Sequence, residues 1–290
     1  MKLNYINKIK ANISIYSNKK TSNYLDGAYK SIYRGKSMNF ENLREYVIND
    51  DIKNIDWKTS AKTNKLYVKQ FISEKKHNIL FIIDNSISMS ADTNFHENKK
   101  NIALFTIGTI SYIAIKNNDY IGLLYQESNN IIYKPFKSNL YSLEKYLYEY
   151  DNSNISNDYD INELIDYTYE NISKRMIIVL ITDIKGIDSI NKSTLRKIIN
   201  YNDLLIVNIN DNYMTGNNVF DIRTNKYIPS FLLKDKKLND IEKRIKKEII
   251  NNNKIKLKDN NISITTISSK NEINNKIIQL LEEHKYANKY

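Results

Sequence analysis

The chain of 290 residues contains no cysteine and only three histidines, six glycines and two prolines. Disulfides and thiolate metal sites are therefore excluded, and three scattered histidines cannot supply a zinc cage. Any metal must be held by oxygen. No window approaches about eighteen uninterrupted apolar residues, and the opening segment is broken by Asn and Lys, so we expect neither a transmembrane segment nor a signal peptide. These absences predict a cytoplasmic protein.

Arginine is also scarce, although the formal net charge is +11, because only six of the 44 basic residues are Arg. Lysines near phosphates gain from counterion release, which makes a lysine-rich nucleic-acid-binding protein one alternative. However, Asn, Ile, Lys and Tyr are all abundant, as expected when coding sequence is rich in A and T. The basic residues are dispersed over helical segments rather than gathered beside aromatic residues. We therefore expect no nucleic-acid partner.

From residue 78 onward, apolar strands alternate with amphipathic helices. The clearest strands are NILFIID at 78–84, YIGLLYQ at 120–126, MIIVLITD at 176–183 and DLLIVNIN at 203–210. Near-continuous Ile, Leu and Val predict strands covered on both faces. The sequence thus predicts an α/β domain over residues 76–290, with a doubly wound, mostly parallel sheet. Residues 1–75 open with an amphipathic stretch and then lose any clean period, which predicts a smaller N-terminal segment containing short strands.

Two of these strands end in a carboxylate, at Asp84 and Asp183. Ligands bind such sheets beyond the carboxyl ends of the strands, at a topological switch point. Residues i and i+2 of an extended loop project to one side, so Ser86 and Ser88 can face the same point as Asp84. Carboxylate and hydroxyl oxygens suit Mg²⁺, or Mn²⁺ or Ca²⁺. The competing interpretation is that Asp84 and Ser86 only form local turns or a helix cap.

An enzymatic role for Asp84 is the second alternative. A carboxylate at a strand end acts as phosphoryl acceptor in haloacid-dehalogenase-like phosphatases, which need a second carboxylate two residues later. That position is Ser86 here. A serine nucleophile would need a base, and no histidine follows a strand. We expect no enzymatic activity, and a metal-dependent phosphohydrolase using Asp84 remains the alternative.

Two motifs resemble known families. The segments DNSISM and LITDI resemble the D-x-S-x-S motif and the later strand-end aspartate of the metal-ion-dependent adhesion site in von Willebrand factor A-type domains. The segment RGKSMNFENLREYVINDDIKNIDWKTSAKTNKLYVKQFISE resembles the signature of the family called domain of unknown function 58. The resemblance covers about residues 25–210. It implies a von Willebrand factor A-like, Rossmann-like fold and a non-enzymatic protein-binding role, with a MoxR-type AAA+ ATPase and a client protein as partners in protein maturation or assembly.

The resemblance also shows where the chain departs from the pattern. Adhesion sites of this type commonly take a third-loop threonine, and the corresponding register places Tyr159 there. Asp158 or Asp160 could supply an oxygen instead.

The signature residues in the N-terminal segment are open to two interpretations. They are Arg44, Glu45, Asp50, Asp51, Asp56 and Trp57. In the structural interpretation Trp57 is buried against the sheet, and Arg44 or a lysine pairs with an acidic residue. In the other, these residues form a docking surface for the ATPase or a client.

Overall fold

The computed structural model describes residues 3–16, 25–29, 39–48, 50–72, 76–128, 130–156, 159–211, 220–221, 226–227, 236–258 and 260–287. The chain divides into a large unit, Met1–Ile32 with His77–Tyr290, and a small unit, Tyr33–Lys76. The second boundary lies beside the one expected after residue 75. The first 32 residues differ from the prediction, because they belong to the large unit.

A six-stranded sheet forms the centre of the large unit, in the order β10-β7-β6-β3-β4-β5. Five strands are parallel, and β5 runs antiparallel to β4 at one edge. This confirms the predicted mostly parallel sheet. The strands are β3 Asn78–Ile83, β4 Tyr120–Glu127, β5 Asn130–Lys137, β6 Ile177–Thr182, β7 Asp203–Ile209 and β10 Ser263–Ile267.

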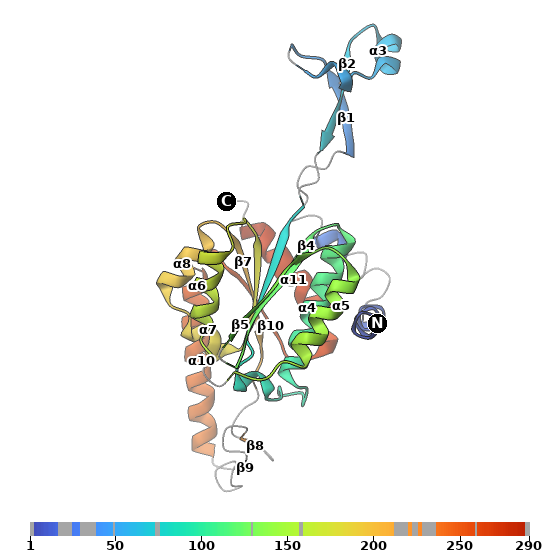
Figure 1. Ribbon diagram of the computed structural model, residues 1–290. Helices are drawn as coiled ribbons and strands as arrows, with labels where there is room; N and C mark the ends of the chain where they lie inside the picture. The colour runs from blue at the N-terminus through green and yellow to red at the C-terminus, as the bar shows by residue number, and fades with distance from the viewer. Residues whose placement is uncertain are drawn as a thin grey trace. The chain divides into compact units, whose positions relative to one another are not determined.

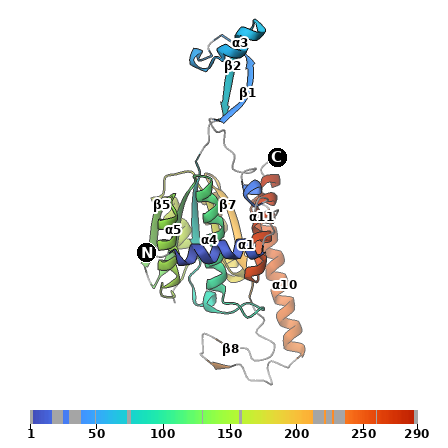
Figure 2. The ribbon, with the colours of Figure 1, turned by 90° about the vertical axis from the view of Figure 1, so that its right-hand side faces the viewer.

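Helices cover both faces of the sheet (Figures 1 and 2). Helices α1 Asn4–Tyr16, α4 Lys99–Lys116, α5 Leu140–Asp151 and α11 Ile273–Ala287 share one face. The other face carries α6 Ile161–Asn171, α7 Ile184–Ser189, α8 Lys192–Ile199 and α10 Lys236–Lys258. Because both faces are covered, β3 and β6 are apolar except at Asn78 and Thr182, and they are almost entirely buried. In the described part of the chain, no helix has both the length and the apolar character needed to span a bilayer.

Helix α1 explains why the first residues belong to the large unit. Ile6, Ile9 and Ile13 lie on one helical face and are buried. The helix packs on α4 and α5, and a Cβ added at Gly108 of α4 would lie 2.1 Å from Ile9 Cδ1. At its N-terminus, two main-chain N–H groups donate to the carboxylate of Glu144, each at 2.9 Å. The helix is therefore fixed by close packing and by a cap from α5.

The small unit is a two-stranded antiparallel sheet with short helices. Strands β1 Asn39–Glu45 and β2 Tyr67–Ile72 pair, and η1 Ile52–Asn54 and α3 Trp57–Thr63 connect them. Its described core contains Ile55 and Val68 but not Trp57, whose surface is 63% exposed. Burial of Trp57, which was one of the two interpretations of the signature, is not observed, because the residue starts a helix that this small unit does not cover.

Candidate functional site

The site lies where β3 and β6 end, at the centre of the sheet. These strands are neighbours, and the Asp84 amide continues their pairing by donating to the carbonyl of Ile181 at 2.9 Å. After β3 the chain crosses to β4 on one side, whereas β6 lies on the other side. This is the switch point of the sheet, so the loops after β3 and β6 diverge and leave room between them. Asp84 and Asp183 are the first residues of these two loops.

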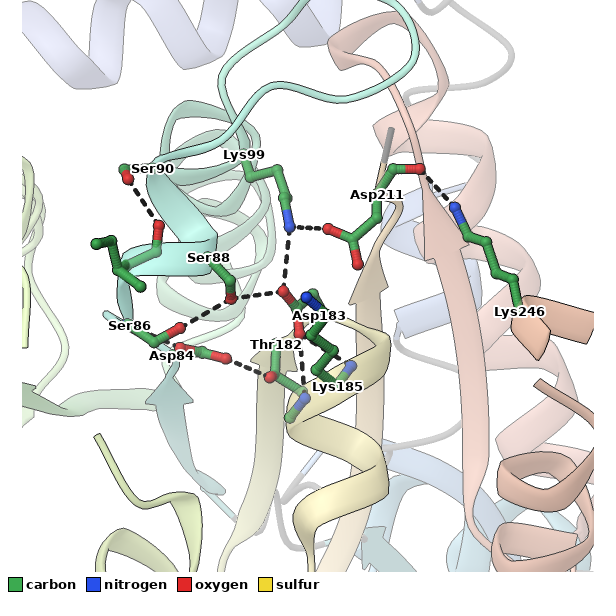
Figure 3. Close-up of polar contacts among 12 residues, drawn as sticks. Asp84, Ser86, Ser88, Ser90, Lys99, Thr182, Asp183, Lys185, Asp211 and Lys246 are labelled. Atoms are coloured by element: carbon green, nitrogen blue, oxygen red, sulfur yellow. Dashed lines mark hydrogen bonds and ion pairs between the residues drawn. The ribbon is translucent and has the colours of Figure 1, made fainter. Parts of the chain in front are cut away.

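The four residues predicted to hold a metal lie together (Figure 3). The Oγ atoms of Ser86 and Ser88 are 3.0 Å apart, and the Ser88 hydroxyl donates to Oδ2 of Asp183 at 2.6 Å. A short 3-10 helix, η2 Ile87–Ser90, directs the two hydroxyls to one side of the loop. The structure therefore brings two carboxylates and two hydroxyls together, although Ser88 lies in this 3-10 helix and not in the extended loop that the spacing argument assumed.

Asp84 is buried and accepts two hydrogen bonds. Its Oδ1 accepts the Ser86 amide at 2.9 Å, and its Oδ2 accepts the Thr182 hydroxyl at 2.5 Å. The first bond is the local turn that the competing interpretation predicted, so turn formation and convergence on the site coexist. Burial, followed by the charge of Asp183, raises the pKa of Asp84 to about 6. A Cβ at Gly186 would lie 1.9 Å from the Thr182 hydroxyl oxygen, so only glycine fits there.

Asp183 serves both as a helix cap and as a member of the site. Its Oδ1 accepts the amides of Lys185 and Gly186, each at 3.0 Å, at the start of α7. Its Oδ2 points toward Ser88. Burial alone would raise the pKa of Asp183, but the charge of Lys99, with the Ser88 hydroxyl and the Gly186 amide, holds this pKa below its ordinary value.

Lys99 also belongs to this cluster, although the sequence analysis did not identify it. This side chain is 0% exposed, and its Nζ lies 3.1 Å from Oδ2 of Asp183 and pairs with the carboxylate of Asp211. Burial would lower the pKa of Lys99, but the charges of Asp183 and Asp211 raise it. The main-chain oxygen of Asp211 in turn accepts Lys246 Nζ of α10 at 2.7 Å (Figure 3).

The third loop contributes Tyr159 rather than a threonine. The Tyr159 hydroxyl is buried and has no hydrogen-bond partner among the described residues. Burial, together with the charges of Asp84 and Asp183, raises its pKa well above the ordinary value. Asp160 is exposed and caps α6 by accepting the Asn162 amide at 2.8 Å, so it is engaged elsewhere. Asp158 lies outside the described residues.

The oxygen atoms present fit a small divalent cation. Neighbouring ligands of an octahedral ion with bonds of about 2.1 Å lie about 3.0 Å apart. The 3.0 Å between the Ser86 and Ser88 oxygens matches this value, whereas the Ser88 and Asp183 oxygens lie closer, at 2.6 Å, in a hydrogen bond that an ion would have to replace. No group of three His, Cys, Asp or Glu residues suitable for a metal occurs in the described ranges. An ion would therefore depend on both hydroxyls as well as on Asp84 and Asp183.

The signature residues of the small unit do not converge on one point. Arg44 pairs with Asp50 at 2.5 Å, and Glu45 pairs with Lys65 at 2.6 Å. Asp51 and Asp56 cap η1 and α3 by accepting main-chain amides. Five of the six residues thus have local structural roles, whereas Trp57 is exposed.

The sheet order and the helices on both faces give a doubly wound, mostly parallel α/β fold, as expected from the sequence. The chain belongs to the family described as "Protein of unknown function DUF58", which matches residues 42–215, more than half of its length. No curated protein matches it.

Similar solved structures include three proteins with low sequence identity. An aerotolerance-related membrane protein from Bacteroides fragilis is 16% identical, with a TM-score of 0.43, over 71% of this chain and 98% of that one. The VWA domain of SpRpn10 is 16% identical, with a TM-score of 0.36, over 47% and 77%. A von Willebrand factor type A protein from Catenulispora acidiphila is 10% identical, with a TM-score of 0.42, over 72% and 43%.

Proposed function

We propose that this protein is a non-enzymatic protein-binding module whose main contact is the cluster at the ends of β3 and β6. The observation that supports this most is the convergence of Asp84, Ser86, Ser88 and Asp183 at the switch point. In this proposal these four residues hold Mg²⁺ or a similar divalent ion. The ion would supply an open coordination position, which accepts a carboxylate from the partner protein.

The chain's own residues would keep this position accessible and aligned. The Thr182 hydroxyl and the Ser86 amide fix both oxygens of Asp84, while the α7 amides fix one oxygen of Asp183. The remaining oxygen of Asp183 and the two serine hydroxyls then face one another. Such preorganisation lowers the ordering cost when a partner binds.

The small unit offers a second contact of different chemistry. Between its two strands, five large apolar side chains are exposed: Val47, Ile48, Ile52, Trp57 and Leu66. Such clusters mark protein contacts, and Trp is enriched among the residues that dominate binding. We propose that this surface binds a MoxR-type AAA+ ATPase in the cytoplasm, while the acidic site binds a client protein during its maturation or assembly.

A pull-down with the immobilised full-length chain tests the proposal that the metal site binds a carboxylate of the client protein. We expect the double variant Ser86→Ala with Ser88→Ala to lose the captured client, as chelation does, because both hydroxyl ligands are removed. Ser90→Ala is the matched control, since the Ser90 hydroxyl donates to the Ile87 carbonyl at 2.7 Å within the same turn and does not face the cluster. Unchanged capture by the double variant, or turnover of a generic phosphatase substrate that depends on Asp84, would contradict the proposal.

A further inference from the structure

A lysine is an unusual first residue for a buried helix N-terminus. Helix α4 begins at Lys99, where the exposed N–H groups of the helix already carry partial positive charge. An ammonium group placed there is unfavourable, and full burial adds a large desolvation cost. Lys99 is nevertheless wholly buried. Strong compensating interactions must hold it in place.

One of these interactions comes from Asp183, a carboxylate of the proposed site, and the other comes from Asp211. Lys99 Nζ contacts Oδ2 of Asp183 and a carboxylate oxygen of Asp211. The Oδ2 atom of Asp183 is also the one that accepts the Ser88 hydroxyl. The ammonium group therefore binds the oxygen that points into the cluster, rather than the oxygen that caps α7. Any divalent ion bound to this oxygen would have a positive charge directly beside it.

We propose that Lys99 is a built-in counter-ion that competes with the divalent ion for Asp183. Without metal, Lys99 offsets the repulsion among Asp84, Asp183 and Asp211 and keeps the site formed. With metal, repulsion between the ion and the ammonium group lowers the affinity, so occupancy depends on the metal concentration. This regulation rests on the proposed function, because it concerns the same metal site.

Replacing Lys99 by methionine tests the competition, because the side chain keeps its approximate length and loses its charge. Metal-stripped full-length protein is titrated with Mg²⁺ and with Mn²⁺ by calorimetry, and its melting temperature is measured in chelator. We expect Lys99→Met to bind metal at least roughly tenfold more tightly than the unmodified chain, because a like charge beside the ion is gone. We also expect it to melt at a lower temperature in chelator.

Lys100→Met is the matched control, since it removes the same charge from the next residue of α4. Lys100 Nζ donates to the Ser153 carbonyl at 2.8 Å rather than to a carboxylate of the site. A general effect of net charge would move both variants alike, whereas competition moves only Lys99→Met. A second variant, Lys99→Met with Asp211→Asn, removes one charge of each sign. Metal affinity can be measured on this variant if the single variant does not fold. We expect it, too, to bind metal more tightly than the unmodified chain.

Equal or weaker metal affinity in the Lys99 variants overturns the proposal, as does an absence of metal binding by every variant. The metal affinities of these variants are measured independently of the client-capture experiment described above. Lys99→Met could bind metal more tightly while client capture is unchanged in the Ser86 and Ser88 double variant. This result would support the competition between Lys99 and the ion, but it would contradict the proposed protein-binding function. If client capture depends on the two serines but Lys99→Met does not bind metal more tightly, only the competition between Lys99 and the ion is contradicted.

Discussion

Three aspartates of the small unit differ sharply in what they do from three aspartates of the large unit. In the small unit, Asp50 forms a surface pair, and Asp51 and Asp56 cap short helices. In the large unit, Asp84, Asp183 and Asp211 follow three adjacent strands. Asp183 and Asp211 pair with the buried Lys99. The residue type and the capping chemistry are similar in both places. Burial and convergence, and not the carboxylates themselves, turn one of these sets into a candidate binding site.

The largest expected effect comes from removing a buried carboxylate. Asp183→Ala leaves the Lys99 ammonium with one carboxylate fewer and removes the cap of α7. We expect a loss of about 3–5 kcal/mol in the free energy of unfolding in chelator, measured by urea denaturation. Asp56→Ala removes only a helix cap and should cost about 1 kcal/mol. Similar losses for the two variants would contradict the contrast between the units.

The second effect concerns the pH dependence of stability. The pKa of Asp84 is about 6 in the folded protein and 3.8 ordinarily, so folding favours its protonated form. This contribution is fully present below the ordinary value and is lost as the pH rises through about 6. Without metal, we expect the free energy of unfolding of Asp84→Asn to rise relative to that of the unmodified chain as the pH increases from about 4 to about 7. The difference should grow by up to about 3 kcal/mol, measured by urea denaturation at each pH.

The variant isolates Asp84 because Asp183 titrates in the opposite sense. The lowered pKa of Asp183 adds stability above its ordinary value, and this stability is lost as the pH falls. Asp183 is present in both proteins, so its contribution largely cancels from the difference. Unfolding free energies that change with pH in parallel for the two proteins would show that Asp84 is not buried as described.

A smaller effect is expected from a single methyl group at Gly186. Alanine there would place Cβ 1.9 Å from the Thr182 hydroxyl oxygen and 3.0 Å from Oδ2 of Asp84. We expect a loss of about 1–3 kcal/mol in the free energy of unfolding, with weaker metal binding, because the loop must shift. Gly27→Ala is the control, since nothing lies within 4 Å of its added Cβ. Thermal unfolding of both variants measures this difference, and equal melting temperatures for Gly186→Ala and Gly27→Ala would contradict the close contact at Gly186.

The smallest effect on stability is expected at Trp57. Its exposed ring contributes little to the core, so Trp57→Ala should change the free energy of unfolding by less than about 0.5 kcal/mol. If the small unit binds an ATPase partner, the same variant should reduce ATPase capture while client capture through Ser86 and Ser88 persists. A large loss of stability would instead favour the structural interpretation of this residue.

The sequence predicted the sheet and the four converging residues because both depend on local patterns. Apolar runs ending in Asp84 and Asp183 identify buried strands, and parallel strands bring their carboxyl ends to the same edge. The 3-10 helix that turns Ser88 toward Ser86 was not predicted, because the sequence argument assumed an extended loop.

Other features depend on contacts between distant segments. The apolar stripe of α1 was visible in the sequence, but its partner groove beside Gly108 was not. Lys99 is one of many lysines, and nothing local distinguishes it. The only available signal was its place at the start of a helix, where a cation is disfavoured. For Trp57 the sequence left burial and exposure open, because aromatic residues are usually buried, whereas a unit this small has little interior.

Helix α1 is synthesised long before the surfaces that receive it. Its isoleucines pack against α4 and α5, which end at residues 116 and 151. At ordinary translation rates the ribosome needs on the order of ten seconds to reach α5. During that time this apolar stripe has no native partner, and a helix of this length is marginal alone in water. The nascent chain therefore exposes an apolar segment, which is a potential chaperone-binding site until the α4 and α5 surfaces have been synthesised.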